Sequence, residues 1–202
     1  LHAYFDWNSQ NVIRGEATPI YCYWPAAIQR IHVYNPEAKI IMLLRHPAHR
    51  AYSQWRMEFQ RGDEILQFAD AISEKGRLRV KQALGDIHRI YSYVERGFYS
   101  NQIARLKDFF HEDQILFLRT DEYWSKPQQI MQKIARFLGV RYKEDLKSEF
   151  ISPIIANLKS IPTNYSYYHE IDSLKNIYKK DIIQTQLLTG ISLLDWLAII
   201  DT

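Results

Sequence analysis

Apolar runs of strand length alternate with stretches of helical period along this chain. Residues 40–44 are five consecutive apolar residues, a run typical of a parallel strand that is covered on both faces. Residues 114–118 form a second buried-type run, and the short aromatic run at 20–23 also predicts a strand. Helical patterns occupy residues 25–34, 47–60, 64–75, 78–95, 99–110, 127–138 and 167–189. This order predicts an α/β fold with a central parallel sheet.

Proline, serine and glycine mark several of the predicted helix ends. Pro47 fits the first turn of the helix that follows the first buried run. Ser125 is the expected cap of the helix that Pro127 opens, and Gly139 is its expected left-handed end. Residues 148–165 hold two prolines and little periodicity, so we expect a loop there.

The composition is typical of a soluble globular protein. Of the 202 residues, 47% are hydrophobic and 24% are charged, which predicts a single domain over residues 1–202. No apolar run approaches the roughly 18 residues that span a membrane. The lone cysteine, Cys22, excludes an internal disulfide and a cysteine-based zinc site. We expect Cys22 to be a buried, inert thiol and the protein to be cytoplasmic.

Positive charge is distributed unevenly. The net charge of +3 is too small to indicate nucleic-acid binding, and no strand interleaves basic with aromatic residues as RNA-binding sheets do. However, residues 75–107 hold eight Lys or Arg against Asp86 and Glu95. The stretch just before them adds Arg45, Arg50, Arg56 and Arg61. We expect one side of the protein to attract anions; the alternative is a set of solvated helix faces.

The sharpest chemical feature lies where the first buried run meets the next helix. Arg45 stands at the carboxyl end of the predicted strand, the edge where open α/β sheets bind ligands. The helix begins near Pro47, so its free N–H groups point to the same place. Ser53 follows one to two turns into that helix. A guanidinium and a hydroxyl at a helix start suit a phosphate; alternatively, Arg45 forms a surface salt bridge and Ser53 packs.

Residues 39–53 resemble the 3′-phosphate-binding strand and helix of the PAPS-dependent sulfotransferases, closest to the bacterial and heparan-sulfate-type branch. The shared pattern is an apolar strand followed by Arg-x-Pro-x-x-Arg-x-x-Ser. The resemblance implies that Arg45 and Ser53 hold the 3′-phosphate of PAPS (3′-phosphoadenosine 5′-phosphosulfate) or of its product PAP. It also implies a three-layer sandwich related to the P-loop nucleotide-binding fold.

The resemblance extends over nearly the whole chain. Further segments resemble the family in order and spacing: Gly15–Tyr21, Arg96–Tyr99, Ile115–Tyr123, Pro127–Gly139 and Gly190–Trp196. Lys159 and Ser160 fall where the family often carries a basic loop over the nucleotide, although Lys159 is the only cation there.

One family motif does not occur in the chain. The Gly-rich loop of the form Lys-x-Gly-Thr-(Ser/Thr), which holds the 5′-phosphosulfate, is absent. By the register of the resemblance, this loop and the glutamate that is the usual general base would precede Leu1. We expect the chain to be part of a longer protein; the alternative is a domain that has lost the donor loop.

The resemblance implies attack of an acceptor hydroxyl or amine on the sulfuryl group, with no metal. His2 is a candidate near the expected base, or a polar residue at the start of an element. Glu16 could be catalytic or could support a turn. Tyr99 could contact the acceptor or belong to the core, and Trp55 could stack on adenine or pack on Phe59, four residues further along the helix.

Three classes of function remain at this stage. We expect a PAPS-dependent sulfotransferase whose acceptor is a sugar, a lipid or a small molecule. The alternative from another class is a non-catalytic domain that binds PAP or another anion, or a partner protein. A nucleotide-dependent kinase is disfavoured because the chain lacks a Walker lysine.

Overall fold

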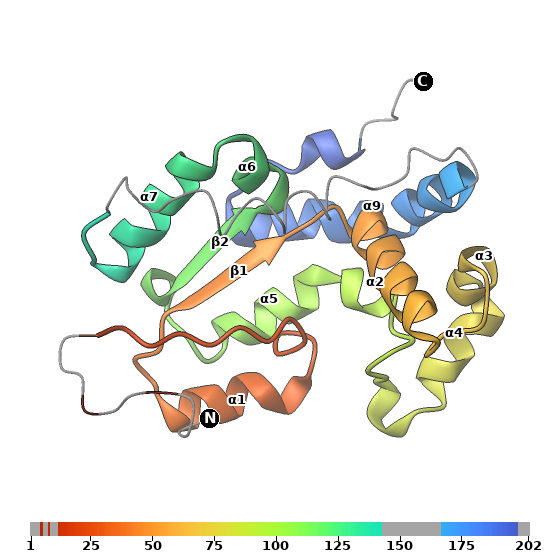
Figure 1. The fold of residues 1–202 in the computed structure, drawn as a ribbon, viewed down its shortest axis with the longest axis horizontal. Helices are drawn as coiled ribbons and strands as arrows, with labels where there is room; N and C mark the ends of the chain where they lie inside the picture. The colour runs from red at the N-terminus through yellow and green to blue at the C-terminus, as the bar shows by residue number, and fades with distance from the viewer. Residues whose placement is uncertain (1–4, 6–7, 9–11, 143–166, 198–202) are drawn as a thin grey trace.

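The fold is built around a small parallel sheet (Figure 1). The computed structural model describes residues 5, 8, 12–142 and 167–197. Within them, β1 (Ile40–Leu44) pairs in parallel with β2 (Ile115–Arg119), and the register sets Ile40 opposite Ile115. Both buried-type runs are therefore strands, and the predicted α/β class with a parallel sheet is confirmed.

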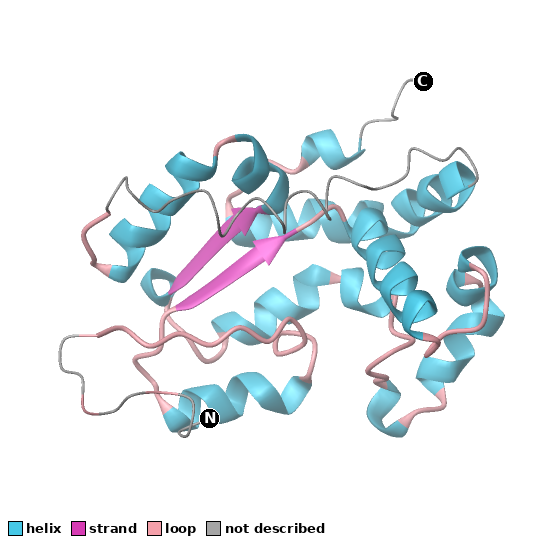
Figure 2. Cartoon of the chain, in the orientation of Figure 1, coloured by secondary structure: helices cyan, strands magenta, loops and turns pink. Residues whose placement is uncertain are grey.

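Helices make up most of the rest of the described chain (Figure 2). The α-helices are α1 (Pro25–Tyr34), α2 (Pro47–Arg61), α3 (Phe68–Ile72), α4 (Glu74–Lys81), α5 (Tyr99–Lys107), α6 (Thr120–Ser125), α7 (Pro127–Leu138) and α9 (Tyr168–Thr189). Short 3₁₀ turns lie at Leu84–Asp86, Glu95–Gly97, Glu112–Gln114 and Leu194–Leu197. The helices at α1, α2, α5, α7 and α9 match the predicted ranges within a few residues.

The main core lies on one face of β1. Met42 and Leu44 point to this face and belong to a buried cluster with residues of α2, α5 and α9. Leu44 is fully buried, which stabilises the fold by roughly 1.5–3 kcal/mol. On the opposite face of the strand Leu43 is 46% exposed, so the expectation that both faces of β1 are covered is wrong at that position.

Close contact between α9 and the chain before α5 depends on Gly97. The ring of Tyr178 in α9 is fully buried, and its hydroxyl donates a hydrogen bond to the carbonyl oxygen of Val94 at 2.7 Å. A Cβ atom on Gly97 would stand only 2.5 Å from that hydroxyl oxygen. Glycine therefore lets the tyrosine ring pack directly on the backbone that leads into α5.

The prediction of a strand over residues 20–23 is wrong. These residues form successive turns, in which the N–H of Tyr21 donates to the carbonyl of Thr18 and that of Trp24 donates to the carbonyl of Ile20. The turns lead directly into α1, so the aromatic run closes a loop before a helix.

The helix predicted over residues 64–75 is divided into α3 and the start of α4, and the helix predicted over 78–95 is wrong beyond the end of α4 at Lys81. The carboxylate of Glu64 accepts the N–H groups of the next two residues at 2.9 Å, which holds the chain out of a helix there. Ser73 interrupts the pattern because its hydroxyl caps α4 by accepting the N–H of Gly76. After α4 the chain turns through Gly85, whose φ is 69°.

The boundary between α6 and α7 differs from expectation by one residue. Lys126 occupies the N-cap position of α7 without a side-chain hydrogen bond, whereas Ser125 ends α6 and its hydroxyl donates to the carbonyl of Asp121 at 2.9 Å. Gly139 takes the expected left-handed conformation at the end of α7, with φ 75°. The loop predicted over residues 148–165 lies outside the described residues.

None of the helices in the described ranges combines the length and the apolar character needed to cross a lipid bilayer.

Candidate anion site at the carboxyl edge of the sheet

The turn between β1 and α2 joins a half-buried arginine to a helix N-terminus. Arg45 follows the last residue of β1, and α2 begins two residues later at Pro47. The first hydrogen bond of the helix runs from the N–H of Arg50 to the carbonyl of His46, so the N–H groups of Ala48 and His49 have no partner inside the helix. The positive end of a 15-residue helix thus meets the base of the Arg45 side chain.

The guanidinium of Arg45 lies against an aromatic ring. Its central carbon lies 5.4 Å from the ring centroid of Trp124 in α6. Among the residues that the structure describes, none forms an ion pair or a hydrogen bond with this guanidinium. Burial lowers the pKa of Arg45, and the nearby charge of Arg50 acts in the same direction. The charged group is thus partly desolvated without a counter-ion, a state that a bound anion would relieve.

Ser53 lies further along α2 and is half-buried. It follows His49 by four residues, so the two side chains lie on the same helix face. Within the described chain the hydroxyl of Ser53 has no hydrogen-bond partner. Arg45 and Ser53 therefore both keep donors available beside the first two turns of α2.

Tyr99 contacts the backbone of the turn between β1 and α2. Its hydroxyl donates to the carbonyl oxygen of Arg45 at 2.9 Å, and the side chain is only 5% exposed. Its backbone N–H donates to the carboxylate of Asp181 in α9 at 2.8 Å. Burial raises the pKa of Tyr99, so its hydroxyl keeps its proton at neutral pH. Tyr99 belongs to the core, as the second alternative from the sequence had it, and it acts on the turn through its hydroxyl.

His46 links the same turn to the segment after α9. Its Nε2 lies 3.0 Å from the carbonyl oxygen of Trp196, and because a carbonyl only accepts, this nitrogen carries the proton. The ring of His49 lies 4.8 Å away, centroid to centroid. Burial lowers the pKa of both histidines to about 4, so both rings are neutral at pH 7.

Trp55 has the contacts of a packing residue. Its side chain is 4% exposed, its indole N–H donates to the carbonyl of Leu66 at 2.9 Å, and its ring lies 5.1 Å from that of Phe59. The pair with Phe59 is the packing alternative named from the sequence, and Trp55 does not line the turn at Arg45.

Glu16 has the contact of a turn residue. It is exposed, and its carboxylate accepts a hydrogen bond from the hydroxyl of Thr18 at 2.5 Å. This local bond corresponds to the supporting role considered for Glu16. The other candidates named from the sequence, His2, Lys159 and Ser160, lie outside the described residues.

Sequence reasoning did not connect three of the side chains that build this site with Arg45. Trp124, Trp196 and Asp181 come from elements far along the chain, and no local motif connects them to Arg45. The family resemblance covers the segments Arg96–Tyr99 and Gly190–Trp196, but their spacing does not show that the Tyr99 hydroxyl reaches Arg45 or that the Trp196 carbonyl reaches His46.

Metal binding and thiol reactivity both depend on how side chains are placed in the described part of the chain. Across residues 5, 8, 12–142 and 167–197, no group of three or more His, Cys, Asp or Glu side chains is placed to hold a metal ion. Cys22 is half-buried, and burial raises its pKa to about 11, so the thiol is not ionised at pH 7.

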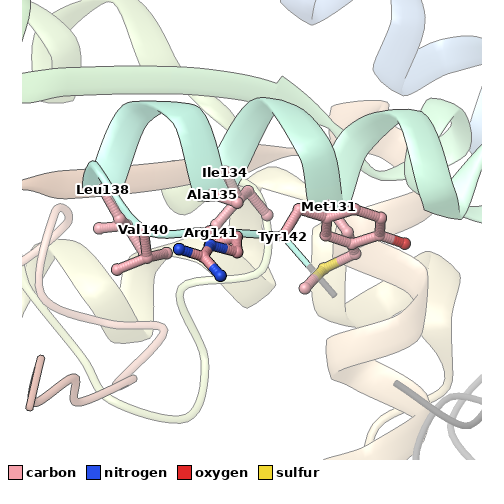
Figure 3. Close-up of a pocket in the computed structure, with 7 residues that line it drawn as sticks. All are labelled: Met131, Ile134, Ala135, Leu138, Val140, Arg141 and Tyr142. Atoms are coloured by element: carbon pink, nitrogen blue, oxygen red, sulfur yellow. The ribbon is translucent and has the colours of Figure 1, made fainter. Parts of the chain in front are cut away.

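A pocket elsewhere on the molecule has a different character. It encloses about 230 Å³ along α7 and the residues that follow (Figure 3). Its lining is mainly apolar and consists of Met131, Ile134, Ala135, Leu138, Val140, Arg141 and Tyr142. None of these residues belongs to α2 or to the turn at Arg45, so the pocket is separate from the anion site.

Comparison with known proteins identifies the family of the chain. Residues 20–183 match a protein family described as the sulfotransferase domain. Human heparan sulfate glucosamine 3-O-sulfotransferase 6 is 25% identical over 126 residues, which are 62% of this chain and 35% of that protein. A bifunctional heparan sulfate N-deacetylase/N-sulfotransferase 1 from Xenopus laevis is 31% identical over 118 residues, 56% of this chain and 13% of that protein. The chain thus spans about a third or less of these relatives.

The fold has a counterpart among solved structures. The crystal structure of a sulfotransferase from Alicyclobacillus acidocaldarius superposes with a TM-score of 0.68 at 24% identity, covering 88% of this chain and 64% of that one. The likeness confirms the fold expected from the sequence resemblance.

Proposed function

Because the chain belongs to the sulfotransferase domain family, we propose that it transfers a sulfuryl group from PAPS to an acceptor, with Arg45 and Ser53 holding the 3′-phosphate of the donor. The main support is the guanidinium of Arg45, which is half-buried at the carboxyl end of β1 and has no counter-ion among the described residues. Such a group at a helix N-terminus favours a phosphate over any neutral ligand.

Several contacts prepare the turn for this role. The ring of Trp124 lies beside the Arg45 guanidinium, and the hydroxyl of Tyr99 fixes the Arg45 carbonyl. Side chains held in this way lose little conformational freedom when a ligand arrives. The free N–H groups at the start of α2 add partial positive charge on the same side.

The chemical step follows from the donor. The acceptor oxygen or nitrogen attacks the sulfur, the bond from sulfur to the bridging phosphate oxygen breaks, and PAP leaves with that electron pair. The acceptor proton passes to a base, which we do not assign to any described residue. Arg45 and Ser53 act at the far phosphate, so their contribution is to align the donor for in-line attack.

The names of the relatives favour a carbohydrate as the acceptor. Two are named for heparan sulfate, and a mouse relative is named carbohydrate sulfotransferase 15. We therefore propose a carbohydrate hydroxyl or amine as the acceptor of this chain.

Calorimetric titration with PAP tests the binding part of the proposal. The Arg45→Ala variant should lose about 2–4 kcal/mol of PAP binding free energy, the range for a partly buried charge-assisted contact. Arg61→Ala is the matched control, since Arg61 lies in the last turn of the same helix and forms only a 3.9 Å pair with Glu58. Equal PAP affinity in folded Arg45→Ala and in the unaltered protein would remove Arg45 from the site.

Transfer is tested separately from binding. The full-length protein is incubated with radiolabelled PAPS and a panel of polysaccharides, and incorporated sulfate is counted. Labelled polysaccharide that is lost with Arg45→Ala and kept with Arg61→Ala supports the enzyme. PAP binding without transfer to any acceptor would favour the alternative of a non-catalytic PAP-binding domain.

A further inference from the structure

A buried arginine at the end of β2 joins two carboxylates from different parts of the chain. Arg119 is 8% exposed. Its Nε donates to Asp121 at 3.0 Å, and its two terminal nitrogens donate to Asp195 at 2.7 and 2.5 Å. Further bonds reach Asp121 and the carbonyl of Ser192, so every N–H of the guanidinium has an acceptor. These carboxylates raise the pKa of Arg119, and Arg119 lowers the pKa of Asp195.

The two carboxylates differ in their distance from Arg119 along the sequence. Asp121 lies two residues from Arg119 in sequence and belongs to the first turn of α6. Asp195 lies 76 residues away, in the 3₁₀ turn that follows α9. Of the two carboxylates, Asp195 is therefore the one that ties the segment after α9 to the carboxyl edge of the sheet, and the carbonyl of Ser192 adds a second bond from that segment at 2.8 Å.

Trp196, the residue after Asp195, contacts the turn that carries Arg45. Trp196 is 5% exposed, and its ring centroid lies 5.4 Å from the central carbon of the Arg119 guanidinium and 5.8 Å from the ring of His46. Its carbonyl oxygen accepts the Nε2–H of His46 at 3.0 Å. His46 is the residue between Arg45 and Pro47, so the position of Trp196 bears directly on the turn.

We infer that Asp195 is a positioning residue for the anion site: its ion pair with Arg119 holds the Trp196 carbonyl against His46 and thereby fixes the turn that carries Arg45. The inference rests on the proposed function for the identity of the ligand. Asp195 touches no ligand in this scheme. It acts through Arg119 and Trp196 on a residue adjacent to the ligand-binding guanidinium.

A matched pair of variants separates this role from general stability. Asp195→Ala and Asp121→Ala each remove one carboxylate from the same guanidinium, and each leaves the other in place, so Arg119 stays paired. Calorimetric titration with PAP should show affinity reduced roughly fivefold to tenfold in Asp195→Ala and less than about twofold in Asp121→Ala. Thermal unfolding of both variants is measured alongside, because a purely structural role would lower the melting temperature in both without this split in affinity.

A second readout does not depend on PAP. In protein labelled with ¹⁵N-histidine, the His46 ring, assigned by a His46→Gln variant, should appear as the neutral form with the proton on Nε2. Asp195→Ala should shift those signals, and Asp121→Ala should leave them in place.

The two measurements fail in distinguishable ways. If the unaltered protein does not bind PAP, the proposed function is wrong, and the His46 signals still decide whether Asp195 positions the turn. Unchanged His46 signals in Asp195→Ala, or equal losses of PAP affinity in the two variants, would overturn the inference.

Discussion

Replacing Gly97 by alanine tests the close packing of Tyr178 in α9 on the backbone before α5. The added Cβ would stand 2.5 Å from the hydroxyl oxygen of Tyr178 and 2.6 Å from the ring carbon that bears it. Real Cβ contacts are not this short, so the ring must move, and it is fully buried with little room to do so.

The cost has two parts. Overpacking of a close-packed core costs about 1–3 kcal/mol. Displacement of the ring also breaks the 2.7 Å hydrogen bond from Tyr178 to Val94, and a buried unpaired group costs about 1–3 kcal/mol. We expect Gly97→Ala to lower the free energy of unfolding by about 2–6 kcal/mol, a large part of the roughly 5–15 kcal/mol that stabilises a domain.

Urea denaturation followed by circular dichroism measures this loss. Gly15→Ala is the control, because a Cβ at Gly15 meets no atom within 4 Å, and its free energy of unfolding should change by less than about 1 kcal/mol. The double variant with Tyr178→Phe should lose less than the sum of the two single losses, since the hydroxyl that clashes with the new Cβ is gone. A Gly97→Ala protein as stable as the Gly15→Ala control would show that the contact with Tyr178 is not as described.

Three further predictions concern the anion site. Tyr99→Phe removes the hydrogen bond to the Arg45 carbonyl and should weaken PAP binding by about 0.5–1.5 kcal/mol in calorimetry, with Arg61→Ala unaffected. Trp124→Leu should weaken PAP binding more than Trp124→Phe does, because phenylalanine keeps a ring face for the guanidinium; equal losses would argue against that contact. Since folding lowers the pKa of His46 and His49 from 6.5 to about 4, the unfolded chain binds more protons between these values, so their contribution to stability is complete above pH 6.5 and is lost as pH falls toward 4. Urea midpoints measured from pH 7.5 to 4.5 should therefore fall, and the slope should flatten in His49→Gln; an identical slope in that variant would contradict the assignment.

The sequence predicted the elements whose pattern is long and regular. The buried-type run before Arg45 and the amphipathic stretch after Pro47 each formed the expected element, and so did the helix that ends at Gly139. In each case the local preference and the tertiary packing favour the same structure.

Residues 88–94 show where such reasoning fails. The carbonyl of Tyr93 accepts a hydrogen bond from Arg50, and the carbonyl of Ile90 accepts one from Gln54 at 2.7 Å. The tyrosine hydroxyl reaches Glu64 at 3.0 Å. Side chains from distant positions thus take up the backbone groups that a helix would have paired, and a single sequence does not reveal those partners.

The candidate site likewise has one part that the sequence predicts and one part that only the fold shows. Arg45 and Ser53 could be named because they flank one strand–helix junction and are close in sequence. The contacts of Arg45 with Tyr99 and Trp124, and of His46 with Trp196, join residues far apart along the chain and become visible only in the fold.

The bond between His46 and Trp196 has a consequence for how the protein is made. The two residues are separated by 150 positions, so the first part of the site leaves the ribosome long before its last anchor does. A nascent chain halted before residue 196 can form β1 and α2. The turn at Arg45 then still lacks the hydrogen bond from His46 to the Trp196 carbonyl. Ligand binding should therefore reach full strength only after residue 196 has emerged, well after the strand and helix that flank Arg45 have been made.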